Sequence, residues 1–119
     1  MTVFVSYILQ LPSPQPLQLE DLDPQLRQWR GRGQMLDVLG HQMFSLRQGE
    51  SNETLILIHG FPTSSFDYFD VIDKLSEHYQ VLVFDHLGFG FSDKPSDYTY
   101  SLVDQAEQAL ALWRQLGIK

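Results

Sequence analysis

The sequence has no cysteine and few basic residues. Without cysteine, the chain can form no disulfide, no thiolate metal site and no cysteine nucleophile. The sequence contains only 8 Lys and Arg residues but 15 Asp and Glu residues, which gives a formal net charge of −7. Binding to nucleic-acid phosphates requires a clustered basic surface. We therefore expect no nucleic-acid partner, and we expect a reducing compartment to suit this chain.

Long apolar runs are also absent. The run nearest the amino end covers residues 3–9, whereas a helix that crosses a bilayer needs about 20 residues. No Lys or Arg precedes this run and no small-residue cleavage site follows it, as a secretory signal would require. We expect a short strand or docked arm at residues 3–9, no membrane span, and a cytoplasmic location.

With 119 residues, of which 43% are hydrophobic, the chain has enough material for one globular core. Prolines on alternate positions after residue 11 indicate an extended linker. Asp23 followed by Pro24 is typical of a helix start, and Gly-Arg-Gly of its end, so a short helix is predicted over residues 24–30. We divide the chain into an N-terminal extension, 1–33, and a core, 34–119.

The core begins with strand patterns. MLDVL (35–39) and MFSLR (43–47), separated by a turn at Gly40-His41, predict a hairpin. TLILI (54–58) and VLVFD (81–85) lack the alternation of a half-exposed strand. Both are therefore predicted to be covered on two faces, as the inner strands of a parallel sheet are.

Two helices are predicted around the second of these strands. Ser64 with Asp67 resembles a capping box, and apolar residues then recur every third position, at Phe66, Phe69, Ile72 and Leu75. Three aspartates on the opposite side, Asp67, Asp70 and Asp73, indicate a solvated face. A second box at Ser101 and Asp104 opens a stripe that ends at Gly117 and comprises Leu102, Ala106, Ala109 or Leu110, Trp113 and Leu116. A hairpin followed by β-α-β-α predicts an α/β sheet with crossover helices.

Two unusual loops follow the apolar strands: HGFPTSS (59–65) and DHLGFGFSDKP (85–95). Ligands of open α/β sheets bind beyond the carboxyl ends of strands, so both loops are candidate sites. In the first, Gly60 lets a ligand approach the backbone, and Pro62 stiffens the turn while the Phe61 N–H stays free. Such an amide stabilises a developing oxyanion or halide. The sequence leaves the isomer of the Phe61–Pro62 bond open.

These two loops, followed by Tyr-Thr-Tyr-Ser and a helix, resemble the front of an α/β-hydrolase. The resemblance covers residues 29–119 and is strongest to the epoxide-hydrolase and haloalkane-dehalogenase-like branch, which includes the mesoderm-specific-transcript-like proteins. It implies that the Phe61 backbone amide forms half of an oxyanion hole. It also implies that His59, Gly60 and Pro62 shape the substrate-facing loop, that the glycine-rich turn at 88–92 is structural, and that no cofactor takes part.

The catalytic residues of that family are not in the sequence. Its Ser or Asp nucleophile stands on an elbow after the next strand, and an acid and a histidine come later. The sequence ends at LGIK, so we expect an N-terminal half of the hydrolase sheet, truncated before the elbow and inactive alone. The intact parent would hydrolyse an ester, an epoxide or a carbon–halogen bond in a small-molecule substrate. Ser92, in Gly-Phe-Ser-Asp-Lys, follows the wrong strand and lacks the second glycine, which excludes it as the nucleophile.

Three alternatives remain open. The first is a hydrolase fragment. The second is a non-catalytic interaction module, or a decayed hydrolase, that needs a partner. The third is a small nucleotide-binding or flavin-binding protein. The last is disfavoured because Asp93 stands where a dinucleotide loop has its third glycine. In the hydrolase strand order, 54–58 becomes a sheet edge in this fragment, and we expect self-association there. The four histidines, His41, His59, His78 and His86, lack metal-ligand spacing, which favours turn, loop and surface roles.

Overall fold

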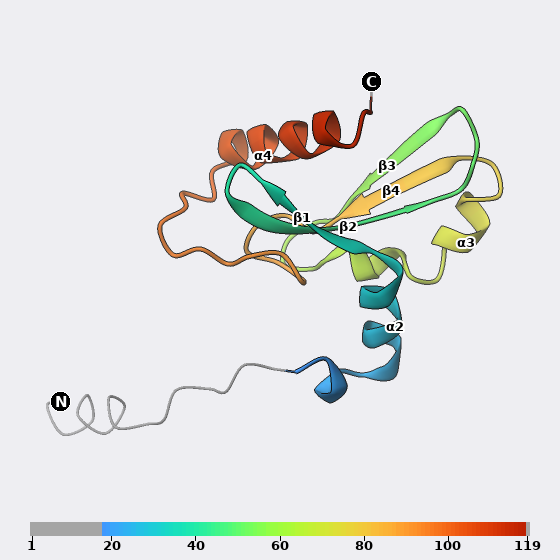
Figure 1. The fold of residues 1–119 in the computed structure, drawn as a ribbon, viewed down its shortest axis with the longest axis horizontal. Coiled ribbons are helices and arrows are strands. Elements are labelled where there is room, and N and C mark those ends of the chain that lie inside the picture. Colours follow the sequence, from blue (N-terminus) through green and yellow to red (C-terminus); the bar gives the residue numbers. More distant parts are fainter. Residues whose placement is uncertain (1–17, 119) are drawn as a thin grey trace, which may run out of the picture.

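The computed structural model describes residues 18–118 (Figure 1). The predicted arm at 3–9 and the proline-rich linker lie outside this range. In chain order the elements are η1 (Leu19–Asp21), α2 (Pro24–Arg32), β1 (Gln34–Val38), β2 (His41–Gln48), β3 (Thr54–Ile58), η2 (Ser65–Tyr68), α3 (Ile72–Leu75), β4 (Gln80–Phe84) and α4 (Leu102–Gln115). The predicted helix after Asp23 is confirmed and runs two residues further, with the Asp23 carboxylate accepting the Gln25 N–H over 2.9 Å.

The strands form one four-stranded sheet in the order β1-β2-β4-β3. The predicted hairpin is confirmed as antiparallel β1 and β2, and β2 continues antiparallel to β4. β3 and β4 are parallel, with Ile56 opposite Leu82 and Ile58 opposite Phe84. The segment between them returns the chain to the same end of the sheet, as the predicted α/β class requires. β3 therefore forms one edge of the sheet, as expected from the hydrolase strand order.

The prediction that both parallel strands are covered on two faces is right for β4 and wrong for β3. Residues 81–84 of β4 are buried, because β4 lies inside the sheet and its side chains pack against α2 and α3 on one face and α4 on the other. Every residue of β3 is at least partly exposed, and Ile58 retains 50% of its accessible surface. The difference follows from position, since β3 has one neighbouring strand and nothing covers its outer side among residues 18–118.

The segment between β3 and β4 is not the single helix predicted. It forms two short pieces, the 3₁₀ helix η2 and the α-helix α3. The apolar spacing of three residues matches the three residues per turn of a 3₁₀ helix better than the 3.6 of an α-helix. The predicted N-cap is confirmed, because the Ser64 hydroxyl accepts the Phe66 N–H over 3.2 Å.

Helices cover both faces of the sheet. In Figure 1, α4 lies on one side of the strands, and α2 and the η2–α3 segment lie on the other. One buried cluster comprises Trp29, Phe44, Leu46, Ile72, Val81 and Val83. The other comprises Val38, Met43, Phe84, Leu87, Ala109 and Leu112. Neighbouring strand residues alternate between the clusters, as side chains on the two faces of a sheet do.

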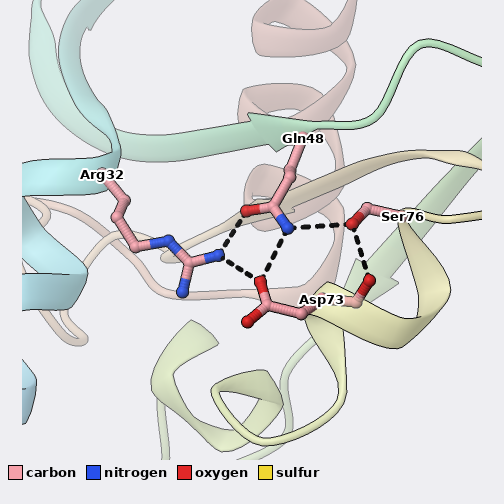
Figure 2. A network of polar contacts seen from close by, with 4 residues as sticks. All are labelled: Arg32, Gln48, Asp73 and Ser76. Atoms are coloured by element: carbon pink, nitrogen blue, oxygen red, sulfur yellow. Dashed lines mark hydrogen bonds and ion pairs between the residues drawn. The ribbon is translucent and has the colours of Figure 1, made fainter.

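The helix α2 is attached to the core in two ways. Its Trp29 is buried, and the indole Nε1–H donates to the Ser65 hydroxyl over 3.1 Å. At its end, Arg32 donates to the side chain of Gln48 and to Asp73 Oδ1, the latter over 2.8 Å (Figure 2). Gln48 Nε2 also donates to Asp73, and this bond, followed by the Arg32 contacts, lowers the pKa of the Asp73 carboxyl. Asp73 is exposed as predicted, but it joins α3 to α2 and β2.

Candidate active site

The two candidate loops lie together at one end of the sheet. Because β3 and β4 are parallel neighbours, the segments that follow them leave from the same edge. The rings of Phe61 and Phe89, one from each loop, have centroids 5.8 Å apart and meet edge to face. The two loops, each a candidate site by its position after a strand, are therefore in contact with one another.

The loop after β3 contains a backbone amide that has no acceptor among the described residues. The Gly60 carbonyl closes the turn by accepting the Thr63 N–H over 3.1 Å and the Thr63 hydroxyl over 2.9 Å. Within residues 18–118 no acceptor meets the Phe61 N–H, and the Phe61 side chain is 86% exposed. The Phe61–Pro62 bond is cis. A Cβ at Gly60 would meet no atom within 4 Å, so the space in front of this backbone is open.

His59 lies beneath this loop and is only 5% exposed. Its Nδ1 is 2.9 Å from the Gly60 carbonyl oxygen, and its Nε2 accepts the backbone N–H of His86 over 3.0 Å. The two imidazole rings pack edge to face with centroids 4.8 Å apart. The loop role predicted for His59 is confirmed, but the side chain is buried and joins the two loops.

His86 is the residue whose place in the site the sequence interpretation missed. Its ring contacts Phe84 as well as His59, and its Nδ1 is buried with no partner among the described residues. Burial lowers the pKa of the His86 imidazole, and the neighbouring His59 lowers it further, against an opposing effect of Asp85. A usable signal existed, because His59 and His86 follow the ends of two strands that were both predicted to be parallel.

The turn after β4 is built around the buried carboxylate of Asp85. Oδ1 accepts the Ser65 N–H over 2.7 Å, and Oδ2 accepts the Phe91 N–H over 2.9 Å. Gly90 has a φ of +54° and lies against this carboxylate, where a Cβ would come within 2.1 Å of Oδ2. This position therefore requires glycine for both backbone angle and space.

Ser92 and Asp93 fasten the same turn to β2. The Ser92 hydroxyl accepts the Phe44 N–H over 2.9 Å and donates to the Asp85 carbonyl over 2.7 Å. Asp93 Oδ2 accepts the Gln42 N–H over 2.8 Å. These contacts bear out the architectural role predicted for the turn, and they leave the buried Ser92 hydroxyl engaged on both sides.

An open apolar cleft of about 790 Å³ lies beside the Phe61 loop. Its walls come from the end of β3, the two loops and α4, and include Ile58, Phe61, His86, Phe89, Leu102 and Trp113. The predicted α4 stripe is therefore only partly right. α4 buries Gln108, Ala109 and Leu112 on the sheet, whereas Leu102 is 88% exposed. Much of the predicted stripe lines the cleft, because within residues 18–118 no strand lies beyond β3 to cover that side of the helix.

Two further observations concern a metal site and a membrane-spanning helix. Within residues 18–118, no group of three or more His, Asp or Glu side chains is arranged to hold a metal ion. In the same range, no helix has both the length and the apolar character needed to cross a bilayer. The chemistry that the described residues offer is hydrogen bonding by a free backbone amide next to an apolar surface.

Comparison with known proteins agrees with this geometry. The family model of the alpha/beta hydrolase fold matches residues 53–119, which include both loops. The chain belongs to the α/β-hydrolase fold family.

Individual relatives place the chain within that family. The mesoderm-specific transcript homolog protein of Homo sapiens is 38% identical over 115 residues, covering 93% of this chain and 32% of the relative. The meta-cleavage product hydrolase of Pseudomonas fluorescens IP01 superposes with a TM-score of 0.66 at 30% identity, covering 71% of this chain and 32% of that structure. The haloalkane dehalogenase DatA of Agrobacterium tumefaciens C58 gives 0.64 at 30% identity, covering 73% and 30%. The chain spans about a third of the length of these proteins.

Proposed function

We propose that this chain supplies the N-terminal part of a hydrolase active site, in which the Phe61 N–H binds the negative charge that develops on the substrate. The observation that carries the proposal is the free Phe61 amide, held at the carboxyl end of a parallel strand beside an open apolar cleft. A preorganised N–H in a water-poor site is an effective oxyanion donor. His59, Gly60 and Pro62 lie on the same loop, and in this proposal they form the substrate-facing wall around the amide.

The intact parent would act on a small-molecule ester, epoxide or carbon–halogen bond. A Ser or Asp nucleophile attacks the reacting carbon, and the bond from that carbon to the alcohol oxygen, the epoxide oxygen or the halide breaks while the Phe61 N–H stabilises the negative charge. Water then hydrolyses the covalent ester intermediate, which releases the product and regenerates the nucleophile. The solved neighbours named as a hydrolase and a haloalkane dehalogenase support this range of reactions. In this proposal, the reaction needs no cofactor.

The 119-residue chain alone is proposed to be inactive. Ser92, the serine nearest to an elbow pattern, is 2% exposed and uses its hydroxyl in two structural hydrogen bonds. We propose 34–119 as a partial hydrolase core and 1–33 as its extension, whose helix α2 is anchored through Trp29. A cytoplasmic location is proposed on the absence of cysteine, since secreted domains of this size commonly use disulfides.

A second candidate role is a non-catalytic module that associates through β3. The observation that favours it is the outer edge of β3, which pairs with no strand of residues 18–118, carries no charged residue and ends at the half-exposed Ile58. An antiparallel pair of two β3 strands centred on Ile56 would set Thr54 opposite Ile58 and Leu55 opposite Leu57. No like charges would meet in this register, and unprotected apolar edges are prone to such pairing.

A chimera tests the hydrolase proposal. Residues 29–119 replace the matching segment of the meta-cleavage product hydrolase, which supplies the remainder of the fold. We expect the folded chimera to hydrolyse a model ester and the 119-residue chain to show no activity above buffer. A folded but inactive chimera would contradict the proposal that residues 59–65 form a working oxyanion loop. Ester hydrolysis by the isolated chain would contradict its proposed dependence on the remainder of the fold.

A further inference from the structure

The hydrogen bonds of His59 define its protonation state. A backbone N–H can only donate, so the Nε2 atom that meets the His86 N–H must carry a lone pair. A carbonyl oxygen can only accept, so the Nδ1 atom that meets the Gly60 oxygen must carry the proton. His59 is thus the neutral imidazole with its proton on Nδ1, and both ring nitrogens are used.

This arrangement links the amide of the candidate oxyanion loop to the rest of the fold. The Gly60 carbonyl held by Nδ1 belongs to the peptide unit whose nitrogen is the Phe61 N–H. The His86 backbone held by Nε2 follows Asp85, which is fixed by the Ser65 and Phe91 amides. Through His59, the orientation of the Phe61 peptide therefore depends on the rigid turn after β4.

We propose that His59 is a positioning residue that holds the Phe61 amide in place as the Nδ1–H tautomer, so that loss of either ring hydrogen bond loosens the loop. A proton on Nε2 would bring two donors, the ring N–H and the His86 N–H, into contact. The catalytic role of the Phe61 amide in this inference rests on the proposed function. The coupling between the two loops follows from the contacts of His59 alone.

The charges that face His59 come from the turn after β4. The His86 ring packs on His59 with the ring centroids 4.8 Å apart. Asp85 lies next to His86, and its carboxylate raises the pKa of the His86 imidazole against the stronger lowering by burial and by His59. The Phe89 ring, with its centroid 5.6 Å away, is uncharged.

Two substitutions separate the two hydrogen bonds. In His59→Gln, the side-chain oxygen reaches the place of Nε2 and can accept the His86 N–H, but it does not titrate. In His59→Asn, the side-chain nitrogen takes the place of Nδ1, and the His86 N–H loses its acceptor. Hydrogen exchange of the His86 amide in the 119-residue chain is the readout, with the Leu82 amide in the central strand β4 as the control for global unfolding. Rates are referred to an unstructured peptide of the same sequence at the same pH.

We expect His59→Asn to raise exchange at His86 about tenfold or more relative to wild type at neutral pH, while Leu82 keeps its protection. His59→Gln, which keeps an acceptor for the His86 N–H, should show exchange at His86 close to that of wild type. The ¹⁵N spectrum of the wild-type ring should show an unprotonated Nε2 at neutral pH. A protonated Nε2, or equal changes at His86 and Leu82, would overturn the proposal even if the variants fail to fold. None of these readouts requires hydrolysis, so they stand apart from the test of the proposed function.

Discussion

The backbone N–H of His86 donates to Nε2 of His59 over 3.0 Å, and this bond fastens the loop after β3 to the loop after β4. It places the segment with the free Phe61 amide on a turn that is fixed by the buried Asp85 carboxylate. The candidate oxyanion donor is therefore held by contacts within this chain, although the chain spans about a third of its relatives.

The first prediction concerns pH and His86. Burial lowers the pKa of its imidazole below the ordinary 6.5, so the unfolded chain binds the proton first as the pH falls. The free energy of unfolding should therefore decrease as the pH falls below about 6.5, until His86 in the folded protein is protonated as well. Urea denaturation at a series of pH values measures this. His86→Phe keeps the ring without the proton and should have a smaller slope, and an unchanged slope would contradict the prediction.

The second prediction concerns two glycines with opposite requirements. Gly90→Ala places a Cβ against the Asp85 carboxylate at a φ of +54°, and we expect it to destabilise the fold by about 2 kcal/mol or more. Gly31→Ala, in α2, meets nothing within 4 Å and should stabilise by about 0.5–1 kcal/mol. Urea midpoints of the two variants against wild type give the comparison. Equal stability of Gly90→Ala and wild type would show that the turn adapts.

The third prediction tests the attachment of α2. Trp29 is 1% exposed, so Trp29→Ala should cost about 3–5 kcal/mol. Trp29→Phe keeps most of the ring but leaves the Ser65 hydroxyl without its donor, and it should cost about 1 kcal/mol beyond the change in packing. Chemical denaturation monitored by far-UV circular dichroism measures both. If Trp29→Ala unfolds at the wild-type midpoint, α2 is not part of the core.

The fourth prediction concerns the free edge of β3. We expect the wild-type chain to self-associate, and Ile58→Lys to shift it toward monomer, because a charge on an edge strand opposes pairing. Val71→Lys is the matched control, since Val71 is also an exposed apolar residue, at 45%, but lies away from the sheet edge. Sedimentation velocity of the wild type and the two variants at equal concentration measures their association states. A monomeric wild type, or an equal response to both lysines, would remove the association proposal.

The strands and the start of α2 could be predicted because their signals are local. TLILI corresponds to β3 residue for residue, and the Asp23–Pro24 pair marks the start of α2. Apolar runs and capping side chains act within a few residues of the chain, so they can be found without tertiary information. The loops of the candidate site were found for a related reason, because each directly follows such a strand.

The remaining features depend on contacts between distant residues. β3 has the composition of a buried strand, and its exposure follows from its place at the edge of the sheet that residues 18–118 form. Leu102, in the predicted apolar stripe, is exposed and lines the cleft beside α4. The His59–His86 bond joins residues 27 positions apart, and the only signal for it in the sequence is that each histidine follows one of the two strands predicted to be parallel.

The proposed stabilisation of charge by the Phe61 N–H is tested most directly by removing that single hydrogen. In the hydrolase chimera, phenyllactate at position 61 replaces the amide by an ester and keeps the phenyl side chain. The same replacement at Phe89, whose N–H donates to the His86 carbonyl over 3.1 Å, is the control for losing a turn hydrogen bond. We predict that kcat for ester hydrolysis falls by about 10²–10³-fold for position 61 and far less for position 89. A kcat that is equal for the two esters would contradict the role assigned to Phe61.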